Sequence, residues 1–371
     1  MKFRFFSKLD TTLFIAIIIL VLLGLIIIFS TSYSSVGTDF LNFKKQLIFS
    51  IIGVILMISA SFFDYRTLKN YTGLLYIIAC FVLTAVLFFG ISIRGTMGWF
   101  DFGLFNFQPV EFVKIIAIIV MAKYLSKTAN CLNDLKRVII SGIYVSLPVT
   151  LIIFQPDFGS ALVLSFIWFS MLFVAGINKK YIALIILFGL TLFAGSWNYV
   201  LKDYQKDRIS VFINPQADPL GAGYNVIQST IAVGSGNIWG KGLGHGSQSQ
   251  LNFLPEKHTD FIFAVIAEEM GLIGVIFMFG LFGIVFQRIF KIISKTQDNF
   301  GKLLVLGASF MIMFHLAVNI GMNMGIMPVT GIPLPFVSYG GSSLISFLLI
   351  IGIIQSVYIK GEGYKIEKEE D

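Results

Sequence analysis

Residues 11–30 read TTLFIAIIILVLLGLIIIFS, an uncharged apolar run long enough to cross the hydrocarbon core of a bilayer as a helix. Similar runs recur along the 371-residue chain, in which 56% of residues are hydrophobic and 13% are charged. This composition excludes a water-soluble globular protein and predicts an all-α polytopic integral membrane protein. Helices are expected because the runs are too long for barrel strands and unpaired backbone groups in lipid are costly.

We predict about ten transmembrane helices in a single integral membrane domain, residues 1–371, because most connections are too short to hold a soluble domain. The expected spans are 11–30, 45–63, 72–91, 109–125, 138–155, 158–176, 181–198, 261–287, 303–325 and 341–359. The large connection 199–260 is polar and glycine-rich, but it also holds Phe212, Tyr224 and Trp239. We therefore expect a folded extracytoplasmic loop that is partly associated with the membrane.

Basic residues fall mainly on one side of the predicted spans. With the N-terminus in the cytoplasm, the short outer loops hold only Lys44, Lys45 and Arg94, and the other side carries most of the net charge of +7. This asymmetry predicts that both termini are cytoplasmic. No basic cluster interleaved with aromatic residues indicates a nucleic-acid partner. The first span is expected to be an uncleaved anchor, and neither cysteine has metal-type spacing.

Asp260 is the most conspicuous polar residue of the chain. It ends the polar run Leu254-Pro-Glu-Lys-His-Thr-Asp, beside Glu256 and His258, where the large loop meets the eighth span. An acid in the first helical turn, with Thr259 as the cap, would stabilise the helix. A partly desolvated carboxylate at the outer membrane surface would instead suit a general base. The two interpretations are compatible.

Two further spans carry buried polar residues. Glu268 lies on the same broad helix face as Asp260, whereas Glu269 points elsewhere. Buried acids in a membrane are expensive and rarely idle, although a hydrogen bond to a neighbouring helix also explains them. In the ninth span a polar stripe at i, i+4 and i+8 indicates hydrogen bonding between helices; its members are His315, Asn319 and Asn323.

Glu111 and Lys114 stand three residues apart at the start of the fourth span, so they share one helix face. They predict either a buried ion pair or a site in which Lys114 binds an anion such as a phosphate and Glu111 positions it.

Three other positions lie near expected span ends. Trp99 suits an interfacial anchor, and Arg94 is a candidate to meet a lipid phosphate. Asp157 suits the tight turn between the fifth and sixth spans. Residues 326–343 hold three prolines in eight residues, so they predict a re-entrant or surface segment rather than a regular helix. Its end, with Ser338 and Tyr339, is placed to offer backbone donors to a phosphate.

Four motifs, in this order, resemble those of the SEDS family (shape, elongation, division and sporulation) and together extend over essentially all spans. They are residues 108–114 (QPVEFVK), 155–161 (QPDFGSA), 254–265 (LPEKHTDFIFAV) and 328–343 (PVTGIPLPFVSYGGSS). The run around Arg94 and the loop residues 246–256 resemble the RodA (elongation) branch more than the FtsW (division) branch. Ser247 and Val110 depart mildly from the usual pattern.

This resemblance implies a SEDS-type (GT-C-like) fold and a peptidoglycan glycosyltransferase. The enzyme would polymerise lipid II into β-1,4 glycan strands at the outer face of the bacterial cytoplasmic membrane during elongation and rod-shape maintenance. The implied partners are a class B penicillin-binding protein, which is a transpeptidase, and the MreC, MreD and MreB components of the elongation complex.

The resemblance also implies roles for single residues. Asp260 would be the essential acid, and Glu111 and Lys114 the paired cavity residues. Further expected cavity or substrate residues are Arg94, Trp99, Glu256, His258, Ser338 and Tyr339, with Asp157 and Glu268 in support. A divalent cation, Mg²⁺ or Mn²⁺, is an open alternative for charge stabilisation, with Asp260 as a ligand. The rival functions are a lipid II flippase and a non-catalytic scaffold that activates a transpeptidase.

Overall fold

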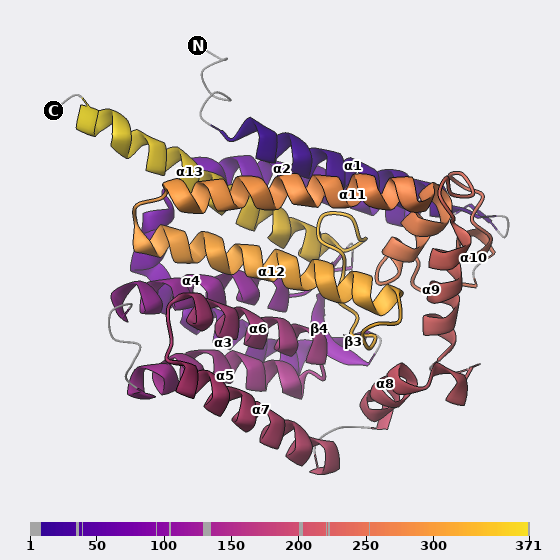
Figure 1. Ribbon diagram of the computed structural model, residues 1–371, viewed down its shortest axis with the longest axis horizontal. Coiled ribbons are helices and arrows are strands. Elements are labelled where there is room, and N and C mark those ends of the chain that lie inside the picture. The colour runs from indigo at the N-terminus through magenta and orange to yellow at the C-terminus, as the bar shows by residue number, and fades with distance from the viewer. Residues whose placement is uncertain are drawn as a thin grey trace.

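The computed structural model describes residues 9–34, 37–38, 40–93, 95–103, 105–128, 135–199, 203–219, 221, 223–251 and 253–369. Its long helices run side by side in one bundle (Figure 1). They are α1 (Thr11–Ser32), α2 (Leu41–Phe62), α3 (Tyr65–Phe89), α4 (Val110–Thr128), α5 (Leu135–Phe154), α6 (Phe158–Val174), α7 (Lys179–Tyr199), α11 (Ile262–Lys295), α12 (Asn299–Asn323) and α13 (Gly341–Glu369). The expected all-α polytopic membrane fold is confirmed.

Helix α12 lies at the centre of the bundle, where it packs against α4, α6 and α11. Helix α13 packs along α2, and α1 packs along α11. In the apolar 18-residue stretch of α13, 78% of the residues are buried, whereas in that of α3 only 22% are buried. The inner helices can therefore carry polar side chains that meet protein rather than lipid.

Seven helices in the described part of the chain are long and apolar enough to span a membrane; they are α1, α2, α3, α5, α11, α12 and the segment Gly341–Gly361 of α13. Each of the other three expected spans also coincides with a helix: α4, α6 or α7. Helix α6 is apolar but shorter, and α4 carries two charges at its start, Glu111 and Lys114, and two near its end, Lys123 and Lys127. The protein is a multi-pass membrane protein, and the count of ten spans stays a prediction.

Helix α1 begins and α13 ends at the same end of the bundle (Figure 1). The opposite end holds the helices of the large connection, which are α8 (Asp203–Ile213), the 3-10 helix Pro215–Ala217, α9 (Tyr224–Ser235) and α10 (Ser247–Gln250). Short antiparallel strands link the long helices: β1 (Tyr33–Ser34) with β2 (Gly37–Thr38), and β3 (Ile91–Ile93), β4 (Thr96–Asp101) and β5 (Asn106–Phe107) in that order.

Helix α11 is interrupted at Gly271, which has φ 65° and ψ −164°, a region that only glycine adopts readily. The segment 236–242 fills the interruption with its own backbone. On one side of the break, Lys241 N donates to Glu268 O and Gly242 N donates to Glu269 O; on the other, Leu272 N donates to Asn237 O and Ile273 N to Ile238 O. The loop thus replaces backbone bonds that the helix loses, which an interrupted membrane helix requires.

Candidate functional site

The Asp260 turn, residues 256–261, precedes α11. Glu256 has φ 55°, and its carbonyl accepts hydrogen bonds from Thr259 N and Phe261 N. The Thr259 hydroxyl donates to Glu256 rather than capping the helix, and α11 starts at Ile262 with Phe261 at the N-cap position. The prediction that Thr259 caps this helix was therefore wrong, because a tight turn displaces the helix start.

The proline-rich segment, residues 326–340, holds this turn by its backbone. Tyr339 N donates to His258 O at 2.8 Å, and the Ser338 hydroxyl donates to Thr259 O at 2.6 Å. On the other side of the turn, the imidazole Nδ1 of His258 lies 2.9 Å from the Thr31 hydroxyl of α1. Ser338 and Tyr339, expected near substrate, thus position the turn that carries Asp260.

The Asp260 carboxylate faces Gly331 of the same proline-rich segment. A Cβ atom added to Gly331, which has φ +75°, would lie 3.8 Å from Asp260 Oδ2. Asp260 as a residue is partly exposed.

Glu111 and Lys114 form the predicted ion pair, with Lys114 Nζ 2.7 Å from Glu111 Oε1. Both side chains are buried, at 3% and 1% exposure. Lys114 Nζ also lies 3.3 Å from His315 Nε2, and His315 Nδ1 lies 3.3 Å from the carbonyl oxygen of Pro333. The pair is thereby connected to the segment that holds the Asp260 turn.

A small polar cavity of about 50 Å³ lies beside this pair. Its lining residues come from α4, α6, α12 and the proline-rich segment, and are Gln108, Glu111, Lys114, Asp157, Gly159, Ser160, Val163, His315, Gly331, Ile332 and Pro333. The volume suits ordered water. Gly331 both lines the cavity and lies beside the Asp260 carboxylate, so the two places adjoin the same residue.

Asp157 has the structural role that its motif predicts and also lines the cavity. Its carboxylate accepts from the backbone N–H and the hydroxyl of Ser160 at 2.9 and 2.8 Å, so it caps α6. Trp99 lies in β4, paired with Ile91, and is not among the cavity residues. Arg94 lies outside the described residues.

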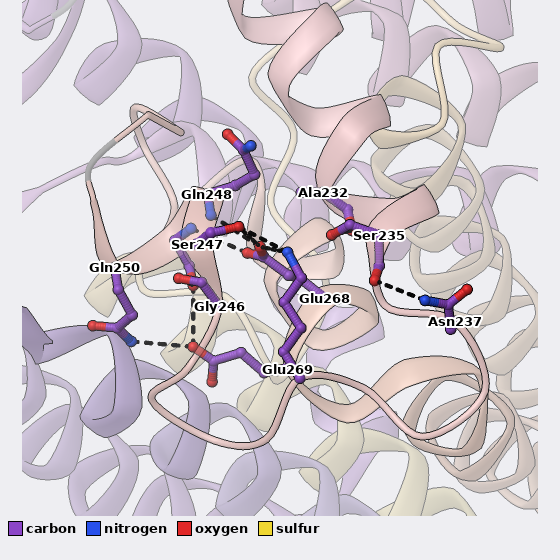
Figure 2. A network of polar contacts seen from close by, with 11 residues as sticks. Ala232, Ser235, Asn237, Gly246, Ser247, Gln248, Gln250, Glu268 and Glu269 are labelled. Carbon is purple, nitrogen blue, oxygen red and sulfur yellow. Dashed lines mark hydrogen bonds and ion pairs between the residues drawn. The ribbon is translucent and has the colours of Figure 1, made fainter.

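Glu268 holds the short helix α10 rather than the Asp260 turn. Its carboxylate accepts from the backbone N–H groups of Gln248 and Ser249 at 2.9 and 3.1 Å, and it pairs with Lys241 Nζ at 2.9 Å. Figure 2 shows Glu268 directed at this N-terminal end of α10, where a carboxylate is favourable.

Glu269 binds the same short helix through other atoms than Glu268 does (Figure 2). Its carboxylate accepts from the Ser249 hydroxyl, the Gln250 amide and the Ser30 hydroxyl of α1. Nearby, Lys257 donates to Ser249 O at 2.6 Å. Burial lowers the pKa of Lys257, and the Glu269 carboxylate opposes that shift.

Sequence reasoning identified the polar stripe on α12 but not what it binds. Hydrogen bonding by the stripe is confirmed, and its partners include Asp260 O. Lys241, which pairs with Glu268, was missed as well. The sequence offered a weak signal for the contact of the stripe with Asp260. The polar stripe runs toward the outer end of the predicted ninth span, and the Asp260 turn precedes the outer end of the predicted eighth span.

Among the described residues, no three His, Cys, Asp or Glu side chains gather into a group that would hold a metal ion. Mg²⁺ is commonly held by one or two carboxylates together with substrate phosphates, so a cation with Asp260 as its protein ligand stays a hypothesis.

Comparison with known proteins places these observations in a family. The profile of the family described as "Cell cycle protein", which covers FtsW, RodA and SpoVE, matches residues 10–362. The peptidoglycan glycosyltransferase MrdB of Escherichia coli (strain K12) is 36% identical over 359 residues, which cover 96% of each chain.

Two solved structures are similar in fold. A chain from work on a peptidoglycan synthase complex that coordinates polymerization and crosslinking gives a TM-score of 0.79 at 32% identity, covering 95% of this chain and 98% of that one. Rod shape determining protein RodA of Thermus thermophilus gives 0.70 at 28% identity, covering 94% and 96%.

Proposed function

Because the chain belongs to the FtsW, RodA and SpoVE family, as its motifs predicted, we propose that it is a peptidoglycan glycosyltransferase that polymerises lipid II during cell elongation. The observation that carries the proposal is the arrangement of Asp260. Asp260 is a partly exposed residue on a turn held by backbone hydrogen bonds, and its carboxylate lies beside Gly331, which also lines the cavity of the Glu111–Lys114 pair.

In the proposed reaction Asp260 acts as the general base. The acceptor's 4-hydroxyl oxygen attacks the anomeric carbon of the donor as the carboxylate takes the hydroxyl proton. The bond from that carbon to the undecaprenyl pyrophosphate breaks, and its electron pair leaves with the pyrophosphate. One direct displacement inverts the α-linked donor into a β-1,4 product.

Negative charge grows on the leaving pyrophosphate, and a buried cation stabilises such charge more strongly than one in water. Lys114 is the buried cation nearest the cavity, and we propose that it supplies part of this field. The cavity of about 50 Å³ is too small for a diphosphate. Substrate binding must therefore widen it, or Lys114 must act through the water that it holds. We retain Arg94 as a candidate for the lipid phosphate.

The partner proposal rests on the similarity to a chain of a peptidoglycan synthase complex. We propose that this chain pairs with a class B penicillin-binding protein and works with MreC, MreD and MreB. The bias of basic residues supports cytoplasmic termini, which would put the Asp260 turn at the outer face, where lipid II is presented.

The test is glycan formation from purified lipid II by the full-length protein reconstituted with its cognate transpeptidase, with moenomycin added to silence contaminating classical glycosyltransferases. Glycan strands are the expected product. A folded complex that makes no polymer but moves lipid II across proteoliposome membranes would favour the flippase. The scaffold alternative predicts neither polymer nor transport, only activation of the transpeptidase.

The buried ion pair gives a separate prediction. Replacing Glu111 with glutamine leaves the Lys114 charge buried without its partner, and this should lower the free energy of unfolding by about 3 kcal/mol. The double variant Glu111→Leu/Lys114→Met should regain most of that stability, because apolar side chains can replace a buried pair. It should still polymerise poorly, because the field of Lys114 is lost. Thermal unfolding and polymerisation assays on the same preparations check both statements, and full activity in the double variant would make the pair purely structural.

A further inference from the structure

Asn319 and Asn323 are fully buried on α12, and their side chains converge on one atom of the Asp260 turn. The Nδ2 group of Asn319 lies 3.0 Å, and that of Asn323 2.9 Å, from the backbone carbonyl oxygen of Asp260. Two amide donors on one carbonyl fix the orientation of that peptide plane. They therefore fix the direction in which the Asp260 side chain leaves the backbone.

Asn323 also completes the start of α11. Its Oδ1 accepts from Ala264 N at 3.1 Å, a donor in the first turn of the helix. The N-cap residue Phe261 offers no side-chain acceptor, so Asn323 takes that function from another helix. The hydroxyl of Ser229 in α9 donates to Asn323 O at 2.8 Å and holds this residue in turn.

Asn319 connects the same carbonyl to the proline-rich segment. Its Nδ2 donates to Ile332 O at 2.8 Å as well as to Asp260 O. Ile332 follows Gly331, the residue beside the Asp260 carboxylate. The Asn319 amide therefore sets the spacing between the Asp260 turn and the proline-rich segment. The Asn319 Oδ1 atom is buried and has no hydrogen-bond partner among the described residues, so the donors are the part of this side chain that the described structure uses.

We propose that Asn319 and Asn323 are positioning residues for Asp260: together they hold its carbonyl, and so aim its carboxylate at the reacting hydroxyl. This inference rests on the proposed function of Asp260 as general base. Neither asparagine needs to touch substrate, because each acts through the backbone of the residue that does.

The first experiment compares Asn319→Leu, Asn323→Leu and the double variant in the lipid II assay with the transpeptidase present. Each single variant leaves one donor on the carbonyl, so we expect kcat to fall about tenfold, with KM changed less than threefold. The double variant should lose more than the product of the single effects, at least about 1000-fold, since misplacement by about 1 Å already costs about 100-fold.

The matched control for Asn319→Leu is Gln355→Leu, which likewise removes two buried side-chain hydrogen bonds, those with the backbone N and O of Asp10 at the other end of the bundle. It should lower thermal stability by a similar amount with kcat unchanged. If the asparagine variants and Gln355→Leu lose stability and activity in parallel, or if the double variant is simply the product of the singles, the positioning role is overturned. Asn319→Asp and Asn323→Asp, which keep the shape but lose the donors, provide the same comparison if the leucine variants do not fold.

A second measurement does not depend on catalysis. In a background without Cys80 and Cys131, Asp260→Cys is allowed to react with a membrane-impermeant maleimide, with and without Asn323→Leu. Release of the carbonyl should change the reaction rate at least fivefold, and an unchanged rate would contradict the inference. If the wild-type complex makes no polymer, the proposed function fails, whereas this measurement still decides whether the asparagines hold the turn.

Discussion

The Asp260→Asn variant is expected to polymerise lipid II about 10²- to 10⁴-fold more slowly than the wild type, the usual contribution of a general base. The turn should still form, because asparagine retains the backbone carbonyl that accepts from Asn319 and Asn323.

The matched control is Asp64→Asn, at the N-cap of α3 on the other side of the bundle. Asparagine caps helices about as well as aspartate, so neither stability nor polymerisation should change. Full polymerisation by folded Asp260→Asn would remove the general-base role from this residue. A parallel loss of stability in Asp260→Asn would instead assign the carboxylate a structural function.

The second large effect is expected from Gly271→Ala. Alanine does not tolerate φ 65° with ψ −164°, and its Cβ would lie 2.3 Å from Gly240 N and 2.6 Å from Ile238 O. Strain and overpacking together should cost about 4 kcal/mol, a large part of the stability of most proteins. Thermal unfolding of the purified complex measures this loss. Polymerisation should fall as well, because the part of α11 before Gly271 includes the start of the helix, which directly follows the Asp260 turn.

Gly280→Ala is the control on the same helix. It has regular helical surroundings and no atom within 4 Å of an added Cβ, so alanine should be neutral or slightly stabilising there. Equal stability of the two alanine variants would show that the break at Gly271 is not required for the fold.

The sequence predicted the helices because length and hydropathy in a bilayer are local properties. It did not single out Gly271, because glycine also occurs at positions 274, 280 and 283 of the same helix. Only the close approach of the 236–242 backbone distinguishes Gly271. In helix α4, hydropathy alone was the weaker guide. Most residues of this helix face other helices, so its charges are compatible with a place inside the bundle.

The sequence predicted those residues of the candidate site whose type and place along the chain are both unusual. It did not predict contacts that depend on how the helices pack. Asp260 stood out as an acid at a membrane edge, and Glu111 and Lys114 as an i, i+3 pair. The bonds from Asn319 and Asn323 to Asp260 O connect residues 59 and 63 positions apart, and no local pattern encodes them. The expected shared face of Asp260 and Glu268 assumed a helix through both, whereas α11 begins after Asp260.

The insertion of residues 236–242 into α11 has a consequence for biogenesis. The ribosome completes this loop before it has made the second half of the helix that the loop repairs, since synthesis runs from the N-terminus. Until residues 268–273 have been made, the four loop groups that bond to them, Lys241 N, Gly242 N, Asn237 O and Ile238 O, lack these partners. The parts of α11 before and after Gly271 can therefore be joined through the loop only after the loop has packed against both of them. Docking of the loop is thus a late step of membrane assembly.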